Sequence, residues 1–226
     1  MRFGALGDIH GDFEAVRRIM RRYPDVPFWL SVGDVADEAG RYVAFGAPLY
    51  WVKGNNENFD LIASRSFPAN LHYIANGQSV EVGALRIAGL GGTLAPSLYD
   101  TPASELPHPV KSTARSTALA DRRRHFVRDE VDACRAMTRI DVLLTHEAPR
   151  PFRAGRMDAG KTPINEVLAD MKPRLHLFGH HHRLSEQQVG GVPSVGLDLV
   201  SRSYLLIDRD TLEYDVIVSS TTAPDA

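Results

Sequence analysis

The sequence of 226 residues has few of the features that mark specialised classes of protein. Cys134 is the only cysteine, so an intramolecular disulfide is excluded and a reducing compartment, the cytoplasm, is expected. No apolar run approaches the ~18 residues of a membrane span, and no signal peptide is expected. The formal net charge of −2 gives no reason to expect a membrane or nucleic acid as the partner. We expect one globular domain over residues 1–218 and a flexible polar tail over 219–226.

Five short apolar runs each lead into residues that can bind a metal. In chain order they lead into Asp8 and His10, into Asp34, into Asn55 and Asn56, into His146, and into His180 and His182. Ligands of open α/β sheets bind just outside the carboxyl ends of the strands. If the five runs are strands, their ends form one shared pocket.

The spacing and chemistry of these residues favour a transition-metal site. Asp8 and His10 are two residues apart, as are His180 and His182, so in an extended segment each pair projects to one side. Carboxylate, amide and imidazole ligands together suit Mn, Fe, Zn or Co.

The rest of the chain alternates helical and strand patterns before it ends in strands. Helices are predicted after Asp12 and over residues 60–63, 119–137 and 163–171, and strands over 80–82, 85–88, 185–189, 192–197, 204–207 and 214–218. Such a pattern indicates two sheets with helices outside them. Residues 93–117 and 148–163 have little regular pattern, and loops of this length are usually functional or disordered.

Some residues that resemble site residues are expected to be structural. Cys134 follows Val127 and Val131 at helical spacing, which predicts a buried thiol. His176 lies inside a predicted strand and is expected to be a hydrogen-bonded core residue.

The ordered motifs Asp-x-His, Gly-Asp, Gly-Asn-x-Glu, His and Gly-His-x-His resemble those of the calcineurin-like metallophosphoesterase superfamily, over about residues 1–208. The resemblance implies an α/β fold: a four-layer α/β/β/α sandwich of two mixed sheets flanked by helices, with the metal site at the C-terminal ends of strands. It implies two metal ions, with manganese expected to support activity. One ion is held by Asp8, His10 and His182 and the other by Asn55, His146 and His180, while Asp34 bridges them. His181 is the variable residue of its motif and is given no metal role.

The reaction that this resemblance implies is hydrolysis of a phosphate ester. Two divalent ions, opposed by Asp8, Asp34 and one bridging hydroxide, keep about one positive charge, which attracts phosphate. Attack would come from the metal-bridging hydroxide, in line with the leaving group.

The third motif departs from the superfamily at Asn56. The usual residue there is a histidine that contacts phosphate and protonates the leaving group, and an amide cannot supply that proton. A general acid contributes roughly 10²–10⁴-fold, most for poor leaving groups. Asn56 and Asp34 are the candidate catalytic residues. We therefore predict a phosphodiesterase acting on a nucleotide or related phosphodiester, with a phosphomonoesterase or a metal-binding scaffold of little turnover as alternatives.

Two further features bear on the substrate. The arginine that follows the second motif in phosphoprotein phosphatases is absent after Asp37, whereas residues 89–93, 125–128, 140–150 and 172–174 resemble lariat-debranching enzymes. Cations gather in two places: Arg150, Arg153, Arg156 and Lys161 after His146, and Arg122, Arg123, Arg124 and Arg128 at the start of the predicted 119–137 helix. Arg150 and Arg153 are candidate substrate contacts, although either group could be solvated surface. Only one aromatic residue, Phe152, lies between the loop cations, so nucleic acid is possible but not indicated.

Overall fold

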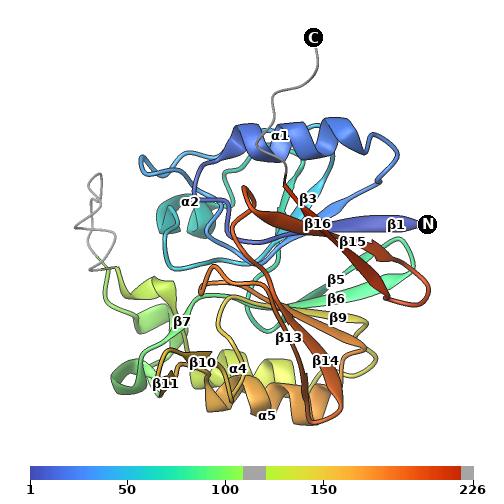
Figure 1. Cartoon of the computed structure of the whole chain (residues 1–226). Coiled ribbons are helices and arrows are strands. Elements are labelled where there is room, and N and C mark those ends of the chain that lie inside the picture. Colours follow the sequence, from blue (N-terminus) through green and yellow to red (C-terminus); the bar gives the residue numbers. More distant parts are fainter. Residues whose placement is uncertain (109–120, 220–226) are drawn as a thin grey trace.

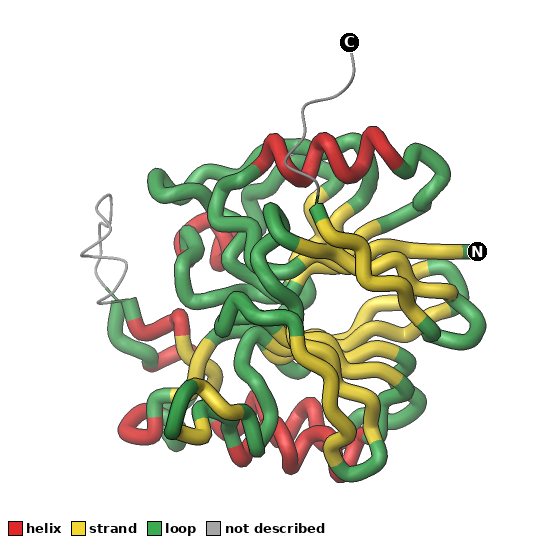
Figure 2. Tube along the Cα trace, viewed as in Figure 1, coloured by secondary structure: helices red, strands yellow, loops and turns green. Residues whose placement is uncertain are grey.

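The computed structural model describes residues 1–108 and 121–219. Two six-stranded mixed sheets pack face to face, and helices cover their outer faces (Figures 1 and 2). This arrangement confirms the four-layer α/β/β/α sandwich. Apart from Ser219, the tail expected over 219–226 lies outside the described residues.

The first sheet carries the N-terminal ligand motifs. Its strands lie in the order β16 (Tyr214–Val218), β15 (Ser203–Asp208), β1 (Arg2–Leu6), β2 (Trp29–Ser31), β3 (Leu49–Trp51) and β4 (Leu71–Tyr73). The four strands from β1 to β4 are parallel, and β15 and β16 continue the sheet antiparallel. Helices α1 (Phe13–Arg22) and α2 (Phe59–Ser64) pack outside it.

The second sheet carries the C-terminal ligand motifs. Its strands lie in the order β13 (Ser185–Val189), β14 (Val192–Gly196), β12 (Leu175–Phe178), β9 (Val142–Thr145), β6 (Leu85–Leu90) and β5 (Gln78–Val82). Strands β14, β12, β9 and β6 run parallel, and the outer strands β13 and β5 are antiparallel to their neighbours. Helices α4 (Arg128–Arg135) and α5 (Thr162–Met171) cover its outer face.

Alternating side chains of β1 and β2 supply two of the three main cores. Phe3 and Leu30 are buried between the two sheets, together with Leu144 of the second sheet. Leu6 and Trp29 point the other way, into the layer beneath α1. Burial on both faces explains why these strands read as nearly continuous apolar runs.

The prediction of a helix over 119–137 is wrong in its N-terminal part. Residues 119–120 lie outside the described residues, and η3 (Arg122–Arg124) is a 3-10 turn followed by β8 (His125–Phe126). Within residues 121–137, only α4 is α-helical. Four buried residues have the spacing of a single helical face: Phe126, Val127, Val131 and Cys134. In the structure Phe126 belongs to β8, Val127 precedes α4, and Val131 and Cys134 lie in α4. Strand β8 is held by tertiary pairing with β7 (Thr93–Leu94), which a local pattern does not reveal.

The two segments with little regular pattern contain short elements. Besides β7, the first includes the 3-10 turns η1 (Pro96–Leu98) and η2 (Ala103–Glu105), and its residues 109–117 lie outside the described residues. The second forms a small hairpin of β10 (Arg153–Ala154) and β11 (Met157–Asp158). The predicted α1, α2, α5 and β5–β6 elements are confirmed. Among the described residues, no helix is long and apolar enough to cross a membrane.

Candidate metal centre

Five parallel strands from the two sheets end at the same place. Strands β1, β2 and β3 are neighbours in the first sheet, and β9 and β12 are neighbours in the second. The residues that follow them are the seven candidate ligands: Asp8, His10, Asp34, Asn55, His146, His180 and His182. Because parallel strands share a carboxyl edge, the sandwich brings all seven together.

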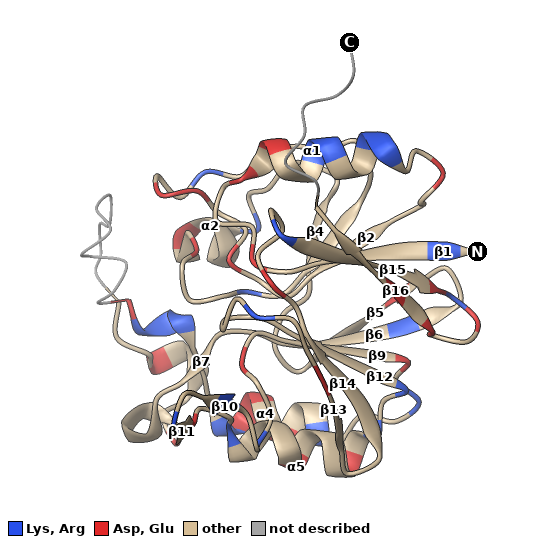
Figure 3. Cartoon of the chain, in the orientation of Figure 1, with Lys and Arg blue, Asp and Glu red and all other residues tan. Residues whose placement is uncertain are grey.

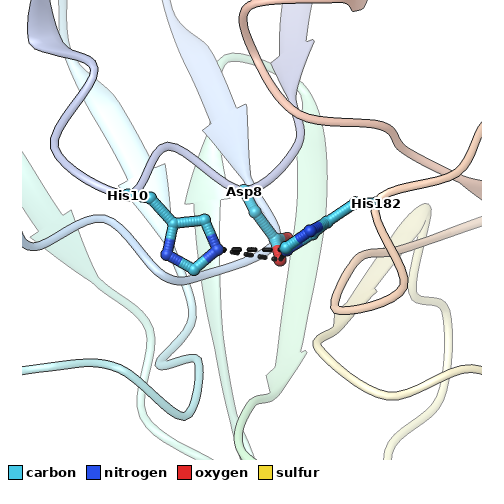
Figure 4. A group of neighbouring side chains, drawn as sticks. All are labelled: Asp8, His10 and His182. Carbon is cyan, nitrogen blue, oxygen red and sulfur yellow. Dashed lines mark hydrogen bonds and ion pairs between the residues drawn. The ribbon is translucent and has the colours of Figure 1, made fainter.

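Asp8, His10 and His182 form the first group, drawn in Figure 4. The Nε2 atom of His182 lies 3.0 Å from Asp8 Oδ2. The same atom lies 3.0 Å from His10 Nε2. The Asp8 side chain is buried, whereas the two imidazoles are partly exposed, so the group opens towards solvent on the histidine side.

The second group is centred on Asp34. Its Oδ2 lies 3.7 Å from His146 Nε2 and 3.5 Å from His10 Nε2, which places this carboxylate between the two groups. Asn55 Oδ1 lies 3.0 Å from His146 Nε2. The His180 ring lies 4.9 Å from the His146 ring, measured between centroids.

These separations are also those of donors that share one metal ion. Two nitrogens about 2.1 Å from one ion and at about 90° to each other lie about 3.0 Å apart. His10 Nε2 and His182 Nε2 show that separation, at 3.0 Å. Two neutral imidazoles that both direct a lone pair at one point repel each other, unless a proton or a cation lies there. The donor set therefore fits a bound cation.

The backbone at four of the seven candidate ligands is left-handed rather than extended. The φ angles are 47° at His10, 49° at Asp34, 69° at His180 and 48° at His182. The expectation of an extended segment at these motifs is therefore wrong, although Asp8 and His10 still converge, with His10 Nε2 3.8 Å from Asp8 Oδ2. Non-glycine residues adopt this region rarely, and such residues cluster at functional sites, where surrounding contacts hold them.

Two glycines allow the loops to approach the buried carboxylates. A Cβ at Gly54 would lie 1.9 Å from Asp34 Oδ1, and a Cβ at Gly179 would lie 2.3 Å from Asp8 Oδ1. Any side chain at either position would displace a candidate ligand. Glycine is therefore needed here for space.

Outer contacts orient the candidate ligands. His146 Nδ1 lies 2.8 Å from the carbonyl of Val32, so it donates there and leaves Nε2 free to bind a metal. Asp8 accepts hydrogen bonds from the backbone N–H of His180 at 3.1 Å. Each bond joins one sheet to the other.

The groups also set each other's charge. Burial by itself would raise the pKa of Asp34, but the imidazoles of His146 and His10 and hydrogen bonds from Asn56 hold it below its usual range. Burial lowers the pKa of His180 to about 3, so this ring is neutral. An ionised Asp34 carboxylate and a neutral His180 ring are the protonation states that metal binding requires of these two ligands.

Asn56 is exposed and contacts Asp34. Its Nδ2 donates to Asp34 Oδ2 at 2.8 Å, and its backbone N–H donates to Asp34 Oδ1 at 2.7 Å. The side chain is thus at the edge of the centre and helps to hold the central carboxylate.

Glu57 has a structural role that the sequence did not reveal. It is buried and accepts hydrogen bonds from the backbone of Val35, Ala36 and Gly54 and from the hydroxyl of Tyr42. Burial, with Asp34 nearby, raises the pKa of Glu57 to about 7. Glu57 therefore ties the loop after β2 to the loop after β3. The only local signal was an acidic residue within the third motif.

Both candidate substrate contacts, Arg150 and Arg153, are exposed to solvent. Arg150 Nε donates to Asp158 Oδ2 at 2.9 Å, so its charge is already paired. Arg153 is exposed on the β10–β11 hairpin.

The expected core role of His176 is confirmed, since its nitrogens contact the hydroxyls of Thr145 and Ser194 at 2.9 and 3.1 Å. Cys134 is buried, as predicted.

Comparison with known sequences finds similarity to phosphoesterases. The family model of calcineurin-like phosphoesterases matches residues 1–184. An uncharacterised protein of Haemophilus influenzae is 24% identical, over 78% of this chain and 81% of its own length. The lariat debranching enzyme of Schizosaccharomyces pombe is also 24% identical, over 77% of this chain, which spans only 42% of that enzyme.

Solved structures share the fold. A protein of Thermus thermophilus superposes with a TM-score of 0.64 at 14% identity, covering 97% of this chain and 99% of that one. A structure described as a novel archaeal phosphodiesterase superposes with a TM-score of 0.50 at 13% identity, covering 96% and 99%. At these identities the likeness concerns the fold alone.

Proposed function

Because the chain belongs to the calcineurin-like phosphoesterase family, we propose that it is a metal-dependent phosphodiesterase that hydrolyses a nucleotide or related phosphodiester. The observation that carries the proposal is the convergence of seven oxygen and nitrogen donors at one carboxyl edge, with Asp34 between two groups of them. The archaeal phosphodiesterase and the lariat debranching enzyme among the similar proteins support it.

The donors divide naturally between two divalent ions. Asp8, His10 and His182 would hold one, and Asn55, His146 and His180 the other, with Asp34 shared. Bound there, such ions supply positive charge for a phosphate oxygen and lower the pKa of the attacking water. The chain itself keeps His146 in the right tautomer through Val32 and keeps Asp34 oriented through Asn56.

The choice of a diester over a monoester rests on the similar proteins, whereas Asn56 bears on the leaving group. Its amide donates a hydrogen bond but holds no proton to transfer near neutral pH, so the leaving group departs without help from this position. Esters with stable leaving groups are favoured under that condition.

A matched set of substrates tests this choice. Steady-state rates of the manganese-loaded protein should be higher on aryl phosphodiesters than on alkyl phosphomonoesters. A clear preference for alkyl monoesters would instead identify a phosphatase.

The shared role of Asp34 is tested by metal analysis. We expect about two ions per chain in the wild type, and Asp34→Ala should lose activity and most of the bound metal because both groups lose a ligand. Full metal occupancy in this variant, measured by elemental analysis, would exclude a bridging carboxylate.

A further inference from the structure

Three consecutive arginines form the η3 turn, and their side chains have different surroundings. Arg123 binds the carboxylates of Asp121 and Asp60, at 2.5 and 2.7 Å. Arg122 is exposed to solvent. Arg124 is half-buried, and within the described residues its guanidinium has no hydrogen bond or ion pair, although its Nε is shielded from solvent. An unpaired, partly buried guanidinium is costly unless a ligand completes it.

A buried lysine fixes Arg124 beside the metal centre. Lys53 directly precedes Gly54 and Asn55, and its Nζ donates to the carbonyls of Arg123 and His125 at 2.8 and 3.0 Å. These two carbonyls flank Arg124, so the lysine holds the backbone on both sides of Arg124. The whole turn is thereby attached to the loop that carries a candidate ligand.

A glycine contact brings the same turn still closer. The backbone N–H of Gly92 donates to the carbonyl of Lys53 at 2.6 Å. A Cβ at Gly92 would lie 2.5 Å from the carbonyl oxygen of Arg124. The β7–β8 pair continues directly from this contact, which leaves the backbone of Arg124 little freedom.

The electrostatics of Arg124 agree with a position that faces the centre. Burial lowers the pKa of Arg124, and the first group that opposes this effect is the carboxylate of Asp34. The side chain therefore lies within the field of the central ligand. Figure 3 shows the basic η3 turn in blue near β7.

We propose that Arg124 binds a phosphate oxygen of the substrate at the metal centre, positioned by Lys53 and the β7–β8 pair. The proposal rests on the phosphoesterase function above, and it names the side chain that binds the anionic substrate. A guanidinium suits this role because its planar N–H groups match phosphate oxygens and stay charged. Asn56 has no such group, and the guanidinium of Arg150 is already paired with Asp158.

Binding of inorganic phosphate to the metal-loaded full chain tests the proposal without requiring turnover. Charge-assisted hydrogen bonds contribute about 1.5–3 kcal/mol, so Arg124→Gln should weaken phosphate binding roughly 10- to 100-fold in calorimetry. Arg122→Gln is the matched control, since it removes the same charge from an exposed position of the same turn. That variant should change the affinity less than about fivefold. Metal content, measured by elemental analysis, should be unchanged in both.

Several outcomes would overturn the role of Arg124. These are equal losses in the two variants, wild-type affinity in Arg124→Gln, and no phosphate binding to the wild type. If Arg124→Gln binds less metal, Arg124→Lys replaces it in the test. A lysine variant with the phosphate affinity of the wild type, and the same specificity for phosphate over chloride, would count against a role of the guanidinium. If phosphate binding depends on Arg124 but no phosphate ester is hydrolysed, the proposed function fails and the binding site stands.

Discussion

At the residue scale, Asn56 is the side chain whose identity most affects the chemistry. Asn56→His introduces a proton donor beside Asp34, at an exposed position where the fold should tolerate the change. We expect faster hydrolysis of esters with alkoxide leaving groups, by up to the ~10²–10⁴-fold of a general acid. Nitrophenyl esters, which leave without protonation, should gain little.

The control for this variant is its metal content. An equal loss of rate on both kinds of ester, with metals retained, would mean that the amide contact between Asn56 and Asp34 outweighs the missing proton donor. Absence of activity in both proteins, with both metals bound, would favour a binding scaffold.

His176 predicts a pH dependence of stability. Burial lowers the pKa of His176 to about 3, below the 6.5 of an unperturbed histidine. The unfolded chain therefore binds a proton that the folded chain excludes between these values, and stability falls as pH falls from 6.5 towards 3. At pH 5 this one residue should cost about 2 kcal/mol relative to pH 7.

His176→Asn removes that titration and keeps a polar side chain beside Thr145 and Ser194. In urea unfolding of the chelator-treated proteins, the free-energy difference between wild type and variant should shrink by about 2 kcal/mol from pH 7 to pH 5. A difference that is independent of pH would show that His176 is not buried in the neutral form.

At the scale of elements, the end of β12 is packed against the end of β1. Gly179→Ala would place a Cβ 2.3 Å from Asp8 Oδ1 and 2.6 Å from Val32 Cγ2. We expect a stability loss of about 1–3 kcal/mol from overpacking, together with weaker metal binding because Asp8 is displaced.

Gly46→Ala is the matched control, since nothing lies within 4 Å of a Cβ there. Thermal unfolding and metal titration of the two variants distinguish a local clash from a general effect of replacing glycine. Equal behaviour of the two variants would contradict the close approach of β12 to β1.

At the scale of the whole molecule, the candidate metal centre draws its residues from both sheets. Asp8 and Asp34 come from the first sheet, while His146 and His182 come from the second, so ions bound there would stabilise the sandwich against separation. Ligands that bind only the folded state add RT ln(1 + [L]/Kd), about 2.7 kcal/mol at a hundredfold excess over Kd.

Removal of metal with a chelator should therefore lower the Tm, and manganese should restore it. Asp34→Ala provides the control, because its Tm should respond much less to the chelator. A wild-type Tm that is the same with and without metal, in scanning calorimetry, would show that the ions do not connect the sheets.

The sequence by itself determined the parts that depend on neighbouring residues. Apolar runs of strand length, each followed by a residue that can bind a metal, located the ends of β1, β2, β3, β9 and β12. Strands that are buried on both faces are apolar at nearly every position, so the local sequence is enough to recognise them. The same reasoning identified His176 as a core residue, since it lies inside such a run. The resemblance of the ordered motifs predicted the sandwich, which the structure confirms, while the division of the ligands between two ions remains a proposal.

Only the tertiary structure decided what depends on residues far apart in the chain. Lys53 donates a hydrogen bond to the carbonyl of Arg123, 70 positions away in the chain. Glu57 accepts one from the backbone of Val35, 22 positions away. The pairing of β8 with β7 likewise interrupts what reads as one helix over 119–137. The left-handed backbone at His10 and His182 has the same origin, because surrounding contacts impose it against local preference. Periodicity reports on nearest neighbours along the chain, whereas these features arise from contacts that exist only once the two sheets have met.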